Sequence, residues 1–143
     1  MSQSLIQVCA VIAAPPGLMR NSLQSLLRAM PQVSVIALAD DLNSVSQMLD
    51  ARRVDFILLD ADLEEQRVAE MAHALHQKQV GTGCLVLASS QVQERALLAQ
   101  GAPHVVIKNF LDESVLRDWL DRLGFQPRVP QDNAAAAVET GGK

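Results

Sequence analysis

The chain has 143 residues, of which 49% are hydrophobic and 20% are charged, so it can form one domain with a full core. Its formal net charge of −4 argues against a strong general attraction to nucleic acid or to an anionic membrane. No apolar run approaches the roughly 18 residues that a membrane-spanning helix needs. We therefore expect a cytoplasmic domain that binds neither nucleic acid nor membrane directly.

The two cysteines, Cys9 and Cys84, both lie inside apolar runs. Cysteine is among the residue types most often buried, so we expect two free, buried thiols, which suits a reducing compartment. The apolar run 8–14 is not a signal peptide, because no basic residue precedes it and Pro15-Pro16 follows it directly.

Short apolar runs alternate with amphipathic segments along the whole chain. The apolar runs, rich in β-branched residues, predict strands over residues 7–13, 33–38, 54–60, 84–87 and 104–107. Apolar residues at helical spacing predict helices within residues 19–30, 42–49, 68–75, 91–100 and 111–123. Five strand–helix repeats predict a three-layer α/β/α, flavodoxin-like fold, whose five-stranded parallel sheet has the strand order 2-1-3-4-5.

Breaks in composition give the boundaries of these elements and of the domain. Asp40-Asp41 can cap the second helix, and Gly124 can end the last one. Beyond Phe125 the chain is rich in Pro, Gln, Asn, Ala and Gly, which cannot bury enough apolar surface to fold alone. We assign residues 1–125 to one domain and residues 126–143 to a flexible tail or linker stub.

The run Val54–Asp60 ends abruptly on a carboxylate, and the strand 104–107 is followed directly by Lys108. In sheets of this kind the ligand crevice lies beyond the carboxyl ends of the strands. The strand order 2-1-3-4-5 brings the ends of strands one, three and five together there. Asp60 is thus either an acceptor for chemistry or one half of an ion pair with Lys108.

Several short segments, in their order and spacing, resemble the receiver domain of bacterial two-component response regulators, in the branch usually joined to a helix-turn-helix output domain. The resemblance covers about residues 7–124. It is carried by Phe56–Asp60, Gly101-Ala102, Val106–Lys108, Met30-Pro31 and Ala39–Asp41. It implies that Asp60 is the phosphoacceptor and that Lys108 contacts the phosphoryl group. A histidine kinase would be the donor, and Mg²⁺ the cofactor that neutralises the phosphoryl charge.

The chain departs from this family at the positions that the chemistry needs most. The acidic pair that holds Mg²⁺ aligns with Ala13 and Ala14, and alanine offers the ion no oxygen ligand. The hydroxyl residue that grips the phosphoryl group aligns with Ala88, and the switching aromatic residue aligns with Val105. Ser89 lies one position further along and, within a strand, would point to the other face. These departures favour a degenerate receiver, or pseudo-receiver.

Two main roles for Asp60 stay open. As a structural carboxylate it would pair with Lys108 and need no metal; without the acidic pair, Lys108 would face one anion instead of three. As a phosphoacceptor it would need Mg²⁺, for which Asp62 is a weak candidate ligand. A small α/β enzyme is a third interpretation, but no Gly-rich phosphate loop follows the first strand. We expect no enzymatic activity and no resident cofactor.

Output is expected through protein contacts, in transcriptional regulation. The resemblance implies a homodimer or partner surface on helix 91–100, strand 104–107 and helix 111–123, with Val105, Val115 and Trp119 as candidates. Trp119 can equally belong to the core. His73 and His76 are expected on a solvated helix face, because two histidines alone make a poor metal site.

Overall fold

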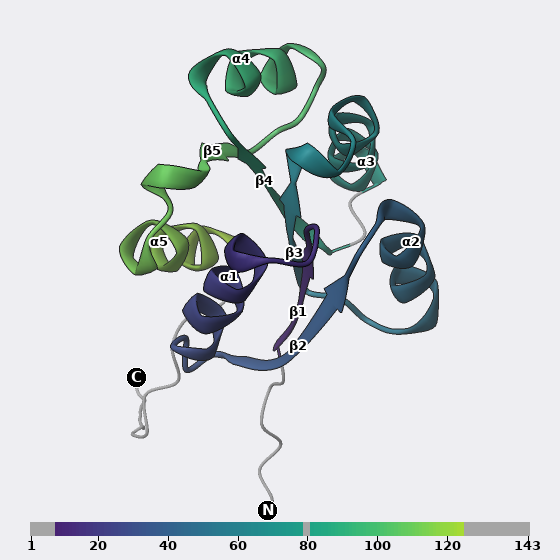
Figure 1. Cartoon of the computed structure of the whole chain (residues 1–143). Helices are drawn as coiled ribbons and strands as arrows, with labels where there is room; N and C mark the ends of the chain where they lie inside the picture. Colours follow the sequence, from purple (N-terminus) through teal and green to yellow (C-terminus); the bar gives the residue numbers. More distant parts are fainter. Residues whose placement is uncertain (1–7, 79–80, 125–143) are drawn as a thin grey trace, which may run out of the picture.

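The structure is a computed structural model that describes residues 8–78 and 81–124. Five parallel strands form one sheet in the order β2-β1-β3-β4-β5, which confirms the predicted fold and strand order (Figure 1). The strands are β1 (Val8–Ala13), β2 (Val33–Ala39), β3 (Phe56–Asp60), β4 (Gly83–Ala88) and β5 (Val105–Ile107). The expected tail, residues 126–143, lies outside the described residues, as does Gln7.

In the described residues, five α-helices and two short 3₁₀ helices accompany the strands. The α-helices are α1 (Leu18–Arg28), α2 (Leu42–Ala51), α3 (Glu65–Lys78), α4 (Gln91–Ala99) and α5 (Glu113–Leu123). The 3₁₀ helices η1 (Ala61–Leu63) and η2 (Lys108–Phe110) follow β3 and β5 directly. Within the described ranges, no helix is long and apolar enough to cross a membrane.

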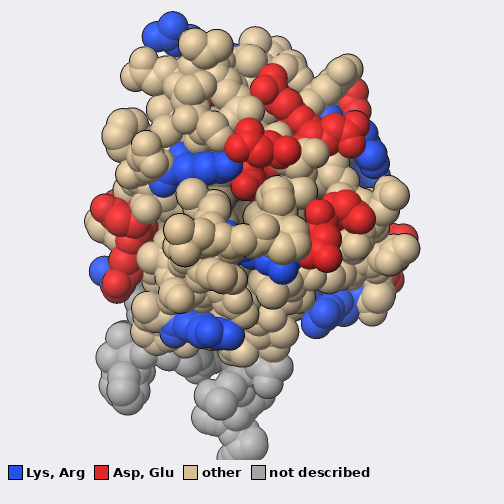
Figure 2. Space-filling view, viewed as in Figure 1, with Lys and Arg blue, Asp and Glu red and all other residues tan. Residues whose placement is uncertain are grey.

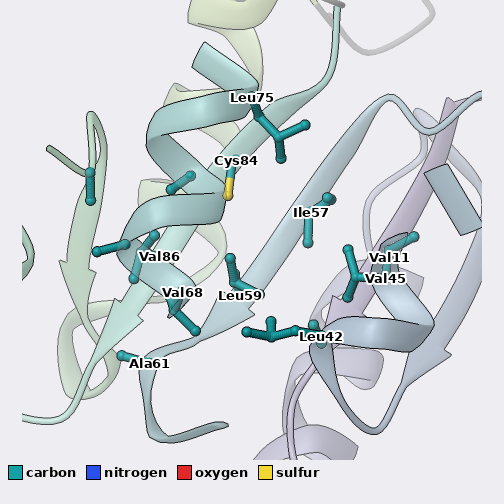
Figure 3. Close-up of a cluster of buried hydrophobic side chains, with 14 of the residues drawn as sticks. Val11, Leu42, Val45, Ile57, Leu59, Ala61, Val68, Leu75, Cys84 and Val86 are labelled. Atoms are coloured by element: carbon teal, nitrogen blue, oxygen red, sulfur yellow. The ribbon is translucent and has the colours of Figure 1, made fainter. Parts of the chain in front are cut away.

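The helices cover the two faces of the sheet unequally (Figure 1). Helices α2, α3 and α4 pack on one face, where Leu42, Val45, Val68 and Leu75 meet side chains of β1, β3 and β4 (Figure 3). Helices α1 and α5 pack on the other. The core cluster between these two helices and the sheet includes Leu23, Leu27, Leu116, Trp119 and Leu120.

Strand β3 lies in the middle of the sheet, and its side chains alternate between the two cores. Phe56 and Leu58 belong to the core under α1 and α5, whereas Ile57 and Leu59 belong to the core under α2, α3 and α4. All four side chains are fully buried. Burial on both faces is why this strand is a continuous apolar run and not an alternating pattern.

Trp119 is a core residue. It is 2% exposed, and its ring meets that of Phe56 edge-on, with the ring centroids 5.6 Å apart. Of the two alternatives left open for Trp119, the structure supports the core and not the exposed partner surface, because the apolar stripe of α5 turns this side chain toward the sheet. Val105 and Val115 are half-buried. Cys9 and Cys84 are free and buried, as expected.

Local signals at the helix ends agree with the sequence. The side chain of Asp41 accepts a hydrogen bond from the Ser44 backbone N–H at 2.8 Å, which confirms it as the cap of α2. Gly124 ends α5 with a φ of +95°, a left-handed conformation that glycine adopts without a steric penalty. On the face shown in Figure 2, acidic and basic side chains are interspersed, and no continuous basic patch is visible.

Candidate functional site

The carboxyl ends of β1 and β3 lie side by side at one edge of the sheet. Ala13 is paired with Leu59 in the register of these strands, so the next residues along, Ala14 and Asp60, follow them at the same edge. Asp60 is only 2% exposed. A carboxylate buried this deeply needs partners, because an unpaired buried charge is costly.

Lys108 supplies the main partner. Its Nζ lies 2.8 Å from Oδ1 of Asp60 and 2.8 Å from Oδ2 of Asp62, and its side chain is 12% exposed. The Asp60 Oδ1 atom also accepts the backbone N–H of Asp62 at 2.8 Å, which caps η1. The expectation that Lys108 faces one anion is thus wrong, because η1 turns the chain and brings Asp62 back over the site.

Asp62 also accepts hydrogen bonds from the segment after β4 and from α4. The Ser89 hydroxyl donates to Oδ2 of Asp62 at 2.7 Å, and the Gln93 amide donates to its Oδ1 at 3.3 Å and to Glu65 at 3.1 Å. The prediction that Ser89 points to the other face is wrong. Strand β4 ends at Ala88, so strand alternation no longer sets the direction of the next side chain.

The charges of this cluster shift two pKa values. Hydrogen bonds from Lys108 and Ser89 lower the pKa of Asp62, although partial burial acts in the opposite direction. Burial alone would lower the pKa of Lys108, but its hydrogen bonds to Asp60 and Asp62 outweigh burial, and the net shift is upward. Lys108 is therefore a firmly protonated cation and cannot act as a base at neutral pH.

The residues at the end of β1 do not fit a magnesium site. Ala13 and Ala14 are fully buried, each packed in one of the two apolar clusters. Across residues 8–78 and 81–124, no three carboxylate, thiol or imidazole groups lie close enough together to hold a metal ion. Mg²⁺ prefers several oxygen ligands and gives up its waters reluctantly, and the side chains of Ala13 and Ala14 offer it none.

Ala88 and Val105, the two other positions at which the sequence departs from the receiver pattern, carry apolar side chains. Ala88 ends β4 and is fully buried. Val105 begins β5, opposite Val86, and packs against the core under α2, α3 and α4. Neither side chain can donate or accept a hydrogen bond.

Sequence reasoning missed two charged residues. Arg20 donates to the Ala14 carbonyl at 3.5 Å and forms an ion pair with Asp40, so a guanidinium closes over the end of β1. Asp55 is buried at the opposite edge, where it accepts the Cys9 N–H at 2.8 Å. The sequence could have pointed to Asp55, because it is a carboxylate inside an apolar run and a buried carboxylate needs a partner. Spacing gave no comparable signal for Arg20.

Comparison with protein-family models gave no match, and no curated protein matched the sequence. Several solved structures, by contrast, match the fold of this chain. The signal receiver domain of the putative response regulator NarL from Mycobacterium tuberculosis superimposes with a TM-score of 0.68 at 22% identity, covering 82% of this chain and 97% of that one. The receiver fold is the fold of this chain. A receiver domain of an HD domain-containing protein from Pseudomonas fluorescens Pf-5 gives 0.68 at 20% identity, covering 83% and 98%.

The receiver fold also occurs in a structure that is longer than this chain. The response regulator ChrA of a heme-sensing two-component system matches with a TM-score of 0.63 at 18% identity, covering 85% of this chain and 59% of that one. At these identities the likeness concerns the fold. It places Asp60 and Lys108 on a receiver scaffold, while their roles here depend on the contacts described above.

Proposed function

We propose that this domain is a pseudo-receiver: a signalling module with the receiver fold that acts through protein contacts and has no metal-dependent phosphoryl switch. One observation carries the proposal. The ammonium of Lys108 is bound to Asp60 and to Asp62, at an edge where β1 ends at Ala13 and is followed by Ala14. The Asp60 carboxylate is thus already paired with a cation of the protein itself.

Electrostatics supports this role. Phosphoryl transfer places charge on the equatorial oxygens, and that charge must be neutralised by cations close to the acceptor. Lys108 is the cation in contact with Asp60, and it already serves two carboxylates. Arg20, nearby at the end of β1, is paired with Asp40. Each of these three carboxylates thus contacts a cation of the protein, so we infer a structural role for Asp60.

NMR tests this function directly. Amide spectra would be recorded with Mg²⁺ plus beryllofluoride and with acetyl phosphate, on the wild type and on Asp60→Asn. We expect no specific shift with either the phosphoryl mimic or the phosphoryl donor. A saturable shift that is centred on Asp60 and lost in Asp60→Asn would contradict the proposal.

One observation favours a second function, a receiver that accepts phosphate from a histidine kinase with Mg²⁺ as cofactor. Asp60 and Lys108 are both present and in contact at 2.8 Å. Incubation with a labelled phosphodonor separates the two functions, because this one requires a label on Asp60 that Asp60→Asn lacks.

We infer that output passes through the face formed by α4, β5 and α5, to a protein partner or a second copy, in transcriptional regulation in the cytoplasm. Val92 and Leu98 are exposed on α4, and Val105 of β5 and Val115 of α5 are half-buried, which supports an apolar contact surface. Light scattering would measure the mass against the 15.5 kDa chain. A homodimer should be disrupted by Leu98→Asp but not by Leu18→Asp on α1.

A further inference from the structure

The two edge strands of the sheet differ in how open they are to pairing with another strand. Strand β5 has three residues and is followed directly by Lys108. Strand β2, at the opposite edge, has seven residues, Val-Ser-Val-Ile-Ala-Leu-Ala, with no charged residue and no proline. Natural proteins commonly use short strands, charges and proline to stop an edge strand from pairing with another chain. Strand β2 has none of these three features, so its edge can accept a further strand.

Alternate residues of β2 turn their backbone N–H and C=O groups away from the sheet. The Ala39 carbonyl accepts the Ala14 N–H at 3.2 Å, so the backbone groups of Ala39 face β1. Residues 35–39 pair with β1 in regular register, and backbone groups alternate in direction along such a strand. The backbone groups of Ile36 and Leu38 therefore face outward, where no described residue forms a hydrogen bond with them. A further strand would use these free donors and acceptors.

The side chains of β2 are incompletely covered on both faces of the sheet. Every residue of β1 and β3 is buried, whereas five of the seven residues of β2 are half-buried and Ser34 is exposed. Ile36 and Leu38 pack against the core under α1 and α5, and Ala37 packs against the core under α2, α3 and α4. A neighbouring strand would cover these apolar groups on both faces, and the burial of apolar surface favours association.

The sequence of β2 suits pairing with a second copy of the same strand. Two identical strands related by a two-fold axis run antiparallel, and with Ile36 on the axis, Val35 lies beside Ala37 of the second copy. That pair combines a larger with a smaller side chain. No charged residue lies within β2, so no like charges are opposed along the pair. The exposed residues Asp40-Asp41, which follow β2, would lie at opposite ends of it.

We propose that β2 is a dimerisation edge, at which a second copy of this chain pairs its own β2 in antiparallel orientation and joins the two sheets into one. This inference goes beyond the pseudo-receiver function and does not depend on it. Strand β2 lies at the other edge of the sheet from β5 (Figure 1). A dimer formed through β2 would therefore leave the face formed by α4, β5 and α5 free on both copies for a protein partner.

Light scattering on the full chain, over a range of concentrations, tests the dimer. We expect the mass to approach twice the 15.5 kDa of one chain as the concentration rises. Ile36→Lys places two like charges opposite each other and should give a monomer, whereas Ile36→Val keeps a β-branched side chain and should remain dimeric. Leu98→Asp on α4 should also remain dimeric. A wild-type chain that stays monomeric, or a dimer that is lost in Leu98→Asp and kept in Ile36→Lys, would overturn the proposal.

Hydrogen exchange on the wild type is a second measurement, which does not require a variant to fold. The amides of Ile36 and Leu38 face outward in one copy and would be hydrogen-bonded only in the dimer, whereas the Ala37 amide faces β1 in both states. On dilution from dimer to monomer, we expect the protection factors of Ile36 and Leu38 to fall at least about tenfold, while that of Ala37 changes little. Equal changes at all three amides, or no protection of Ile36 and Leu38 at any concentration, would contradict pairing through β2.

Discussion

The Nζ atom of Lys108 lies 2.8 Å from Oδ1 of Asp60, although 48 positions separate the two residues in the sequence. The contact joins the ends of β3 and β5, which do not pair directly because β4 lies between them. It therefore links the ends of two strands that share no backbone pairing.

Replacing Lys108 by methionine leaves Asp60 buried without its cation. Removing one partner of a buried ion pair typically costs about 3–5 kcal/mol, and we expect a loss of that size in the free energy of unfolding. Urea titration followed by circular dichroism measures it. Lys78→Met, at the exposed end of α3, is the matched control and should change stability by less than about 0.5 kcal/mol. Combining Lys108→Met with Asp60→Asn should recover part of the loss; a purely additive double variant would contradict the pairing.

The loss of stability at low pH should depend on Asp62. Its pKa is lowered in the folded state by Lys108 and Ser89, so the folded protein favours the ionised form. This contribution is fully present above the unfolded value of about 3.9 and is lost as pH falls through the lower folded pKa. Urea midpoints between pH 6 and 2.5 should fall less steeply in Asp62→Asn than in the wild type. Identical slopes would show that the contacts of Asp62 do not favour its ionised form.

Trp119 offers a test of the corrected core assignment. We expect Trp119→Ala to cost about 3–5 kcal/mol, because it opens a cavity beside Phe56. Trp119→Phe should cost only about 1–2 kcal/mol, since its Nε1 has no hydrogen-bond partner among the described residues and the edge-on ring contact can persist. Leu18→Ala, at a side chain that is 83% exposed, is the control. A near-neutral Trp119→Ala would mean that the ring belongs to the surface.

Asp55 should stabilise the fold through hydrogen bonding more than through charge. It accepts the Cys9 N–H at 2.8 Å in a buried position, whereas its ion-pair partner Arg53 is largely exposed. Asp55→Ala leaves that N–H unpaired and should cost about 1–3 kcal/mol, while Asp55→Asn can keep the acceptor and should cost less. Thermal unfolding of both variants, with Asp50→Ala as the exposed control, separates the contribution of the hydrogen bond to stability from that of the charge. Equal losses for Ala and Asn would assign the effect to the charge.

Features that depend on a residue and its near neighbours could be predicted from the sequence. The two-sided burial of β3 appears as a continuous apolar run, the cap of α2 as Asp41, and the end of α5 as Gly124. The lack of oxygen ligands at Ala13 and Ala14 is likewise a matter of residue type and needs no coordinates. Each of these features depends on a residue and its near neighbours, so periodicity and side-chain chemistry are sufficient to predict it.

Tertiary structure decided which distant groups meet. Lys108 contacts Asp62 as well as Asp60 because η1 reverses the chain, and Ser89 joins them because β4 ends one residue earlier. His76 and His104 face each other across a loop whose path no local pattern specifies. Such contacts depend on where strands end and how loops turn. A one-residue difference there redirects a side chain, and only the folded chain determines it.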